Sequence, residues 1–257
     1  MKKRNLGRNI IISGAGSGIG KETAKLLAKS DFNLILLGRN KQKLEETKYL
    51  IEETQSNSNI KTYACDISNE KALDECFLKI HKSFSKIFGL VNNAGINLAR
   101  EDIVHTNVDD WKSVLETNLS GTYFLTKKTI PLMIKEKEGS IVNISSIAGI
   151  LGMKNRFSYS VTKSALLGFT RSISADYAEY RIRSNCVCPG YINTPLTEKM
   201  LNSLSKKDYQ ALVAKHPLGI GKELYVAEAI KFLLSEKSKW ITGANIPVDG
   251  GYSLGRD

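Results

Sequence analysis

The sequence has few of the features on which membrane spans, disulfide frameworks and metal sites depend. No apolar run in its 257 residues approaches the roughly 18 residues that a membrane span needs. Three histidines, none near another, and no paired C-x2-C motif argue against a metal site. Four cysteines are too few for a disulfide framework in a chain this long, and we expect buried structural thiols: Cys65, Cys76, Cys186 and Cys188. The basic amino terminus is followed only by the short apolar run 10–12, so no secretory signal is visible and we expect a cytoplasmic protein.

Acidic residues are also scarce. The chain has 26 Asp and Glu against 37 Lys and Arg, a formal net charge of +11, and residues 1–48 carry much of the excess. Such a charge indicates an anionic partner, such as a phosphate-rich cofactor or an acidic carrier protein, or else a compositional bias without a partner. The charge would also suit a protein that binds nucleic acid rather than an enzyme, but no helix-turn-helix, zinc or RNP signature supports that alternative. We therefore expect neither a nucleic-acid nor a membrane partner.

Short apolar runs alternate with longer amphipathic stretches. Several runs are apolar without alternation, as in parallel strands that are covered on both faces. The predicted strands are 9–13, 33–37, 60–64, 88–91, 140–144, 183–187 and 244–248, and the predicted helices are 18–30, 40–54, 69–84, 109–136, 158–180 and 225–235. This order predicts an α/β fold, a single doubly wound Rossmann-type domain over 1–257 with a seven-stranded parallel sheet and helices on both faces. Residues 192–216 interrupt the alternation and are expected to form a helical substrate loop.

A glycine-rich turn joins the first predicted strand to the first helix. Its glycines follow a G-x-x-x-G-x-G spacing, with Gly14, Gly18 and Gly20, and Ser17 and Ile19 lie between them. Glycines let the backbone turn sharply and approach a pyrophosphate, while the helix amino terminus offers N–H donors. The spacing is neither G-x-G-x-x-G nor a P-loop, because Glu22 follows Lys21 where a P-loop has Ser or Thr.

These residues and several later motifs resemble the short-chain dehydrogenase/reductase family over nearly the whole chain, most of all its 3-oxoacyl-carrier-protein reductases. The motifs are Asn92-Asn93-Ala94-Gly95, Asn118, Ser146, Tyr159-x-x-x-Lys163, Pro189-Gly190 and Asp249-Gly250-Gly251. The resemblance implies a cofactor-binding part mainly over 9–120 and a catalytic and substrate part mainly over 140–257. It also implies a homotetramer built on the long helices 109–136 and 158–180.

Ser146, Tyr159 and Lys163 are the predicted catalytic residues, with Asn118. Tyr159 and Lys163 are four residues apart and share one helix face. A phenol can protonate a carbonyl oxygen while a nicotinamide supplies hydride, and a nearby ammonium should lower the phenol's pKa. The Ser146 hydroxyl would hydrogen-bond the substrate oxygen. By resemblance, Lys163 holds the ribose of the nicotinamide and Asn118 holds a water behind Lys163.

The end of the second predicted strand indicates NADP(H) rather than NAD(H). An acidic residue there would select NAD, but the chain has Gly38 followed by Arg39, whose fork of donors suits a 2′-phosphate. Ser17 and Asn40 could add hydrogen bonds. By resemblance, the remaining cofactor contacts are Asp66, Ile67, Asn93, Ala94, Gly95, Tyr159, Lys163, Pro189, Gly190, Ile192 and Thr194.

The sequence predicts reduction of a ketone to a secondary alcohol, with a 3-oxoacyl thioester of a carrier protein or CoA as the expected substrate. The segments 147–157 and 194–216 offer an apolar wall with basic residues. The cations that would dock an acyl carrier protein are only partly present, as Lys137, Arg181 and Arg183. Two alternatives stay open: an NAD(P)-dependent sugar or polyol dehydrogenase, and a catalytically silent NADPH sensor.

Overall fold

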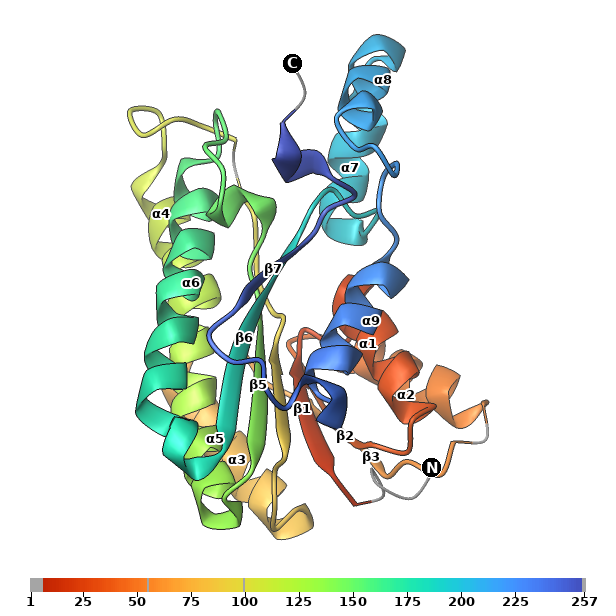
Figure 1. Cartoon of the computed structure of the whole chain (residues 1–257), viewed down its shortest axis with the longest axis vertical. Coiled ribbons are helices and arrows are strands. Elements are labelled where there is room, and N and C mark those ends of the chain that lie inside the picture. The colour runs from red at the N-terminus through yellow and green to blue at the C-terminus, as the bar shows by residue number, and fades with distance from the viewer. Residues whose placement is uncertain (1–6, 55, 99, 256–257) are drawn as a thin grey trace.

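A computed structural model, which describes residues 7–54, 56–98 and 100–255, has a parallel sheet with helices on both faces (Figure 1). The strand order is β3-β2-β1-β4-β5-β6-β7, and every pairing is parallel. The strands are β1 (Asn9–Ser13), β2 (Asn33–Gly38), β3 (Ile60–Ala64), β4 (Gly89–Asn92), β5 (Gly139–Ile144), β6 (Ile182–Pro189) and β7 (Asn245–Val248). The predicted fold class is confirmed, and the strand ends differ from the prediction by at most two residues.

The helices form two layers. Figure 1 shows α1, α2 and α9 on one face of the sheet and α3, α4, α5 and α6 on the other. Their bounds are α1 (Gly18–Ala28), α2 (Lys41–Glu52), α3 (Glu70–Ser83), α4 (Val108–Leu115), α5 (Gly121–Glu136), α6 (Phe157–Tyr177) and α9 (Glu223–Leu233). The predicted helical loop contains α7 (Pro195–Ser203) and α8 (Lys206–Ala214), which rise above the carboxyl ends of the strands.

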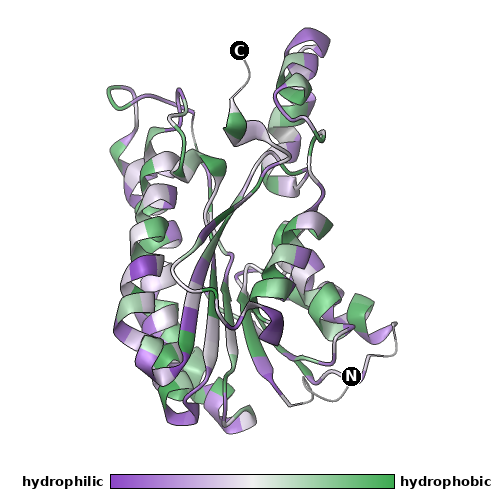
Figure 2. Ribbon diagram, viewed as in Figure 1, coloured by the Kyte–Doolittle hydropathy of each residue, from purple (hydrophilic) through white to green (hydrophobic). Residues whose placement is uncertain are grey.

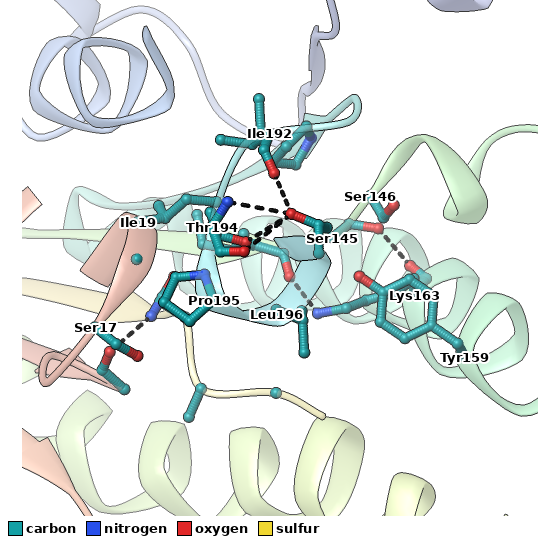
Figure 3. A pocket seen from close by; sticks show the side chains of 18 of the residues that line it. Ser17, Ile19, Ser145, Ser146, Tyr159, Lys163, Ile192, Thr194, Pro195 and Leu196 are labelled. Carbon is teal, nitrogen blue, oxygen red and sulfur yellow. Dashed lines mark hydrogen bonds between the residues drawn. The ribbon is translucent and has the colours of Figure 1, made fainter. Parts of the chain in front are cut away.

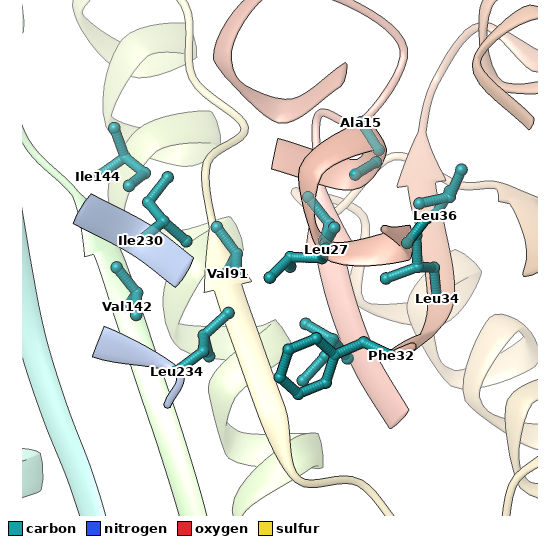
Figure 4. Packing of buried hydrophobic residues seen from close by; sticks show 14 of the residues in the cluster. Ala15, Leu27, Phe32, Leu34, Leu36, Val91, Val142, Ile144, Ile230 and Leu234 are labelled. Atoms are coloured by element: carbon teal, nitrogen blue, oxygen red, sulfur yellow. The ribbon is translucent and has the colours of Figure 1, made fainter. Parts of the chain in front are cut away.

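The central strand β1 explains why the apolar runs do not alternate. Ile10 and Ile12 face the cluster beneath α1 and α9, whereas Ile11 faces the cluster beneath α3 and α5. All three side chains are fully buried. Figure 4 shows the first cluster, in which Leu27, Phe32 and Leu234 lie on the same face of the sheet, and Figure 2 shows apolar residues on the strands and on the helices beside them. The two hydrophobic clusters hold the strands in place and so position the carboxyl ends of the strands, where the candidate site lies.

The predicted helix 109–136 is interrupted. After α4 the chain makes one π-helical turn, Glu116–Ser120, before α5 begins. The extra residue of such a turn re-aims a side chain, and π-turns occur often at functional sites. Here it aims Asn118 toward the backbone of Ile96, which amphipathic periodicity alone could not predict.

The described residues contain no helix that is long and apolar enough to cross a membrane. The same part of the chain has no group of three or more His, Cys, Asp or Glu side chains arranged to hold a metal ion. The four cysteines are buried free thiols, as expected.

Candidate active site

Two adjoining hollows open at the carboxyl ends of β1 and β4, where the strand order reverses and doubly wound sheets bind their ligands. Their volumes are about 190 and 230 Å³. The first, drawn in Figure 3, brings together Gly14, Ser17, Gly18, Ile19, Asn93, Ala94, Gly95, Ser146, Tyr159, Lys163, Pro189, Gly190, Ile192 and Thr194. The second adds Arg39, Asn40, Asp66 and Ile67. Of the predicted site residues, only Gly20 and Asn118 lie outside both linings.

The glycine-rich turn has the shape that a pyrophosphate requires. Gly14 and Gly18 have φ of +66° and +53°, a region that disfavours other residues. A Cβ on Gly20 would lie 2.3 Å from the Gly14 carbonyl oxygen, so Gly20 acts by allowing close packing beneath the turn. Ser17 caps α1 without a side-chain hydrogen bond, and no acidic residue occupies the first turn of α1. The N–H donors and the Ser17 hydroxyl are therefore available to an anionic phosphate.

Asn93 holds this turn in place. Its Nδ2 donates to the carbonyl oxygens of Ser13 and Gly14, at 3.0 and 3.2 Å. The Ser13 hydroxyl in turn accepts from the backbone N–H groups of Asn93 and Ala94. The Asn93 side chain thus links the ends of β1 and β4, which makes it a supporting residue of the cofactor site.

The second hollow has a cationic rim. Arg39 is exposed and, within the part of the chain that the structure describes, belongs to no ion pair. Gly38 brings no carboxylate to the end of β2, and Lys43 lines the same hollow. The Asn40 oxygen accepts from the Lys43 N–H as the cap of α2, which leaves its amide nitrogen for a ligand. These residues fit a nicotinamide dinucleotide that carries a 2′-phosphate.

The catalytic candidates converge on the first hollow. Tyr159 and Lys163 lie one turn apart on α6, and Ser146 follows β5 (Figure 3). The Lys163 ammonium is buried and donates to the Ile144 carbonyl oxygen at 2.7 Å. The Ser145 hydroxyl donates to the Lys163 backbone carbonyl oxygen, also at 2.7 Å, and is engaged by that bond. Ser145 therefore fastens β5 to α6, and Ser146 remains the serine that can reach a substrate.

The pKa values depart from expectation. Burial raises the pKa of Tyr159 above its usual value, and a hydrogen bond with the Ser146 side chain opposes that rise. Burial lowers the pKa of Lys163 to about 8. The net pKa of Tyr159 is thus raised because burial outweighs the opposing effects. The Lys163 ammonium lies 5.6 Å from the centre of the tyrosine ring, and its stabilisation of a phenolate beside a bound nicotinamide stays a prediction. The phenol stays protonated at neutral pH, the form a proton donor needs.

Asn118 lies behind this group. Its Nδ2 donates to the Ile96 carbonyl oxygen at 3.0 Å and to the Thr162 hydroxyl at 3.1 Å, while its Oδ1 accepts from the Ile96 N–H at 2.8 Å. A Cβ on Gly95 would lie 3.2 Å from the Asn118 oxygen and 3.4 Å from the Lys163 nitrogen. The two side chains are thus neighbours across Gly95, and a role for Asn118 in proton transfer stays a prediction.

The two expected substrate segments contribute unequally to the first hollow. Ile147 and Ala148 are buried and do not line the first hollow, because their short helical turn packs inward. The segment 194–216 does contribute to the wall of the hollow, through Pro195, Thr197 and Leu196, half of whose side chain is exposed. Thr194 and Thr197 form the capping box of α7, and a capping signal in the sequence could have placed that helix start.

The predicted carrier-docking cations lie far from this site. Lys137, Arg181 and Arg183 line a separate hollow of about 800 Å³ at the amino ends of β5 and β6. Arg181 precedes β6 and Pro189 ends it, so the eight residues of this strand separate them by about 26 Å. These cations cannot contact a substrate bound at Tyr159 of the same chain.

Comparison with known proteins identifies the family. A family model described as enoyl-(acyl carrier protein) reductase matches residues 14–253. The chain is 36% identical over 248 residues to 3-oxoacyl-[acyl-carrier-protein] reductase of Thermotoga maritima, covering 95% of this chain and 97% of that protein. Among solved structures, levodione reductase superposes with a TM-score of 0.94 at 29% identity, covering 98% of this chain and all of that one. ElxO with NADP bound gives a TM-score of 0.89 at 34% identity, covering 97% and 100%. The chain belongs to the short-chain dehydrogenase/reductase family and is an NAD(P)-dependent oxidoreductase acting on CH–OH and C=O groups.

Proposed function

We propose that this chain uses NADPH to reduce a 3-oxoacyl thioester to the 3-hydroxyacyl thioester. The observation that carries the proposal is the convergence of Tyr159, Lys163 and Ser146 on the hollow that begins at the glycine-rich turn. A catalytically silent sensor would not need a protonated phenol and a hydroxyl directed at one point beside a buried ammonium.

The chain's own residues handle the proton. The nicotinamide, when bound, supplies the hydride to the carbonyl carbon. The Ser146 hydroxyl donates a hydrogen bond to the carbonyl oxygen, and Tyr159 delivers its phenolic proton there as the alcohol forms. Lys163 stabilises the resulting phenolate with its charge. Asn118 holds a water behind Lys163, at the end of the route by which a proton returns to Tyr159. One hydride and one proton thus convert C=O to CH–OH.

The preference for NADPH rests on the second hollow. Arg39 is exposed, has no ion pair among the described residues, and follows Gly38, the position at which a carboxylate would favour NAD. A guanidinium there gains a charge-assisted contact only with the 2′-phosphate.

The thioester class rests on the wall of the first hollow and on the relatives' names. Pro195 and Leu196 give that wall apolar surface suited to an acyl chain, and a sugar would leave these side chains against hydroxyl groups. Several relatives are named 3-oxoacyl-[acyl-carrier-protein] reductases. A small cyclic ketone is the second candidate, because levodione reductase has the same fold to a TM-score of 0.94.

A homotetramer is part of the proposal. The layer of α4, α5 and α6 exposes apolar side chains, among them Val108, Tyr123 and Val161. Light scattering after size exclusion should give about four times the 28.5 kDa of the chain. A monomer would remove this part of the proposal without touching the chemistry.

Substrate profiling tests the activity. The purified chain is assayed by NADPH absorbance with acetoacetyl-CoA, a neutral acetoacetyl thioester, a cyclic diketone and, in the oxidative direction, sugar alcohols. The highest kcat/KM is expected for a thioester. A cyclic diketone turned over faster than either thioester would overturn the substrate assignment in favour of the second candidate.

A further inference from the structure

The helical loop 192–216 is attached through a short neck, made by Tyr191, Ile192 and Asn193 on one side and Gly221 on the other. Ile192 pairs with Gly221 as an isolated parallel bridge. The Gly221 N–H donates to the Tyr191 carbonyl oxygen at 2.9 Å, and the Asn193 N–H donates to the Gly221 carbonyl oxygen at 3.0 Å. Because α7 and α8 lie between these paired segments in the sequence, the neck determines where the loop lies above the catalytic hollow.

A buried histidine lies at this neck. His216 follows the end of α8, and only 3% of its surface is exposed. Its Nδ1 lies 2.9 Å from the carbonyl oxygen of Leu212, which belongs to the last turn of α8. Its Nε2 accepts from the backbone N–H of Tyr191, with the two nitrogens 3.4 Å apart. One imidazole thus joins the end of the helical loop to the residue that precedes the loop.

These two contacts fix the protonation state of the imidazole. A carbonyl oxygen only accepts, so Nδ1 must carry the proton that is shared with Leu212. A backbone N–H only donates, so Nε2 must be unprotonated to bind Tyr191. A second proton would keep the Leu212 bond, where the partial negative charge at the end of α8 favours a cation. It would set two donors against each other at Tyr191, and that bond alone would be lost.

The other titratable groups around His216 keep their charge state near neutral pH. The ring centroids of Tyr191 and Tyr252 lie 5.6 and 4.7 Å from that of the imidazole. Tyr252 belongs to the C-terminal turn, which Figure 1 shows at the same end of the molecule as α7 and α8, and the Asp249 carboxylate in that turn accepts from two backbone N–H groups. Lys215, next to His216 in the chain, is exposed. Phenols and ammoniums stay protonated and carboxylates ionised between about pH 5 and 8, so the imidazole is the member of this group that titrates there.

The neck also positions the wall of the catalytic hollow. Ile192 and Thr194 line that hollow together with Pro195 and Leu196. The Thr197 hydroxyl donates to the Ile192 carbonyl oxygen, which ties the start of α7 to the neck. A displacement of the neck therefore moves the apolar surface that faces the substrate.

We infer that His216 is a positioning residue for ketone reduction: its neutral imidazole holds the helical loop where the loop shapes the substrate wall, and a proton on His216 releases the loop at Tyr191. This inference deepens the proposed function, on which its kinetic test rests. Substrate should bind more weakly as the pH falls through the range in which histidine gains a proton. The chemical step at Tyr159 should be little affected, because His216 touches neither the phenol nor Lys163.

The kinetic test measures KM and kcat for a thioester without phosphate or carboxylate groups, acetoacetyl-N-acetylcysteamine, at about pH 7.5 and 5.5. In wild type, KM should rise about 3–10-fold at the lower pH, the effect of losing one neutral hydrogen bond, and kcat should change less than about threefold. His216→Gln has an amide oxygen that can accept from the Tyr191 N–H and does not titrate, so its KM should not depend on pH. His216→Ala should have the raised KM at both pH values.

A matched control separates His216 from the general effect of pH on the enzyme. His81→Gln removes an exposed histidine from α3 and should keep the pH dependence of wild type. The Tm of each variant at the higher pH shows that it is folded. A wild-type KM that does not rise at the lower pH, or an equal rise in His216→Gln, would overturn the inference.

Amide hydrogen exchange tests the loop without turnover and without a variant. Exchange of the wild-type chain is measured at both pH values and corrected for the intrinsic pH dependence of amide exchange. Protection of the Tyr191 amide and of the amides of α7 and α8 should fall about 3–10-fold at the lower pH, and that of α1 should not change. Unchanged protection at Tyr191 would exclude release of the loop whether or not the chain reduces ketones. Release of the loop in a chain that reduces no ketone would remove the proposed function alone.

Discussion

Arg39 and Gly38 should together determine which dinucleotide binds. Replacing Arg39 by Ala removes the guanidinium from the rim of the second hollow and touches nothing that NADH contacts. A hydrogen bond to a charged group contributes about 1.5–3 kcal/mol. Because Arg39 is exposed, solvent screening favours the lower end, so the Kd of NADPH should rise about 10–30-fold.

The reverse substitution is sterically permitted. A Cβ on Gly38 would meet its nearest neighbour, Leu44 Cδ2, at 3.4 Å, an ordinary contact, and the backbone there does not have a positive φ. Gly38→Asp should therefore fold normally and place a carboxylate where it accepts hydrogen bonds from the free ribose hydroxyls of NADH. The same carboxylate repels a 2′-phosphate, so the preference should move toward NADH.

Fluorescence titration of both dinucleotides with wild type, Arg39→Ala and Gly38→Asp measures these shifts. Arg171→Ala, an equal loss of charge far from the hollow, is the matched control. The NADPH effect of Arg39 should shrink at 1 M salt, because the Debye length falls to about 3 Å. Tighter binding of NADH than NADPH by wild type, or an equal loss for both dinucleotides in Arg39→Ala, would refute the reasoning.

Three further predictions concern the catalytic group. Tyr159→Phe keeps the ring but removes the proton donor, so kcat should fall about 10²–10⁴-fold with the Kd of NADPH unchanged; a near-normal kcat would exclude Tyr159 as the acid. Ser146→Ala should lower kcat about 10²–10³-fold without altering Tm, whereas Ser145→Ala should lower Tm by several degrees through loss of the bond to Lys163; an exchange of the two phenotypes would contradict the assignment. Because the pKa of Lys163 is about 8, the Kd of NADPH should rise several-fold as pH passes through 8, and this dependence should vanish in Lys163→Met. Between about pH 8 and the ordinary lysine pKa of 10.5, the unfolded chain binds more protons at this group than the folded chain does, so Lys163 alone makes the free energy of unfolding rise with pH in that window.

The fold was predictable because local patterns and global topology agree. Uninterrupted apolar runs such as Ile10–Ile12 indicate strands covered on both faces, and the structure divides these three side chains between two cores. The glycine-rich turn was readable for the same reason, since Gly14 and Gly18 take backbone conformations that other residues avoid.

The parts that were not predictable depend on tertiary contacts. Amphipathic spacing continues through 109–136, so nothing in the pattern indicates the π-turn, which is fixed by the bonds between Asn118 and the Ile96 backbone. The inward packing of Ile147 and the distance of Lys137 from the site are likewise set by the fold. Spacing along the chain places a residue on an element but does not say which end of the sheet it faces.

The raised pKa of Tyr159 changes how the site should be understood. Proximity of an ammonium four residues away predicts an acidified phenol, but burial disfavours the charged phenolate and prevails here. The Lys163 ammonium is anchored to the Ile144 carbonyl oxygen, and its own pKa is lowered by the same burial that raises that of Tyr159. Both groups thus enter the reaction in the state that ketone reduction uses at neutral pH, a protonated phenol and a largely protonated amine. The oxidative direction needs the phenolate, and its rate should therefore rise with alkaline pH well beyond the range in which reduction is fastest.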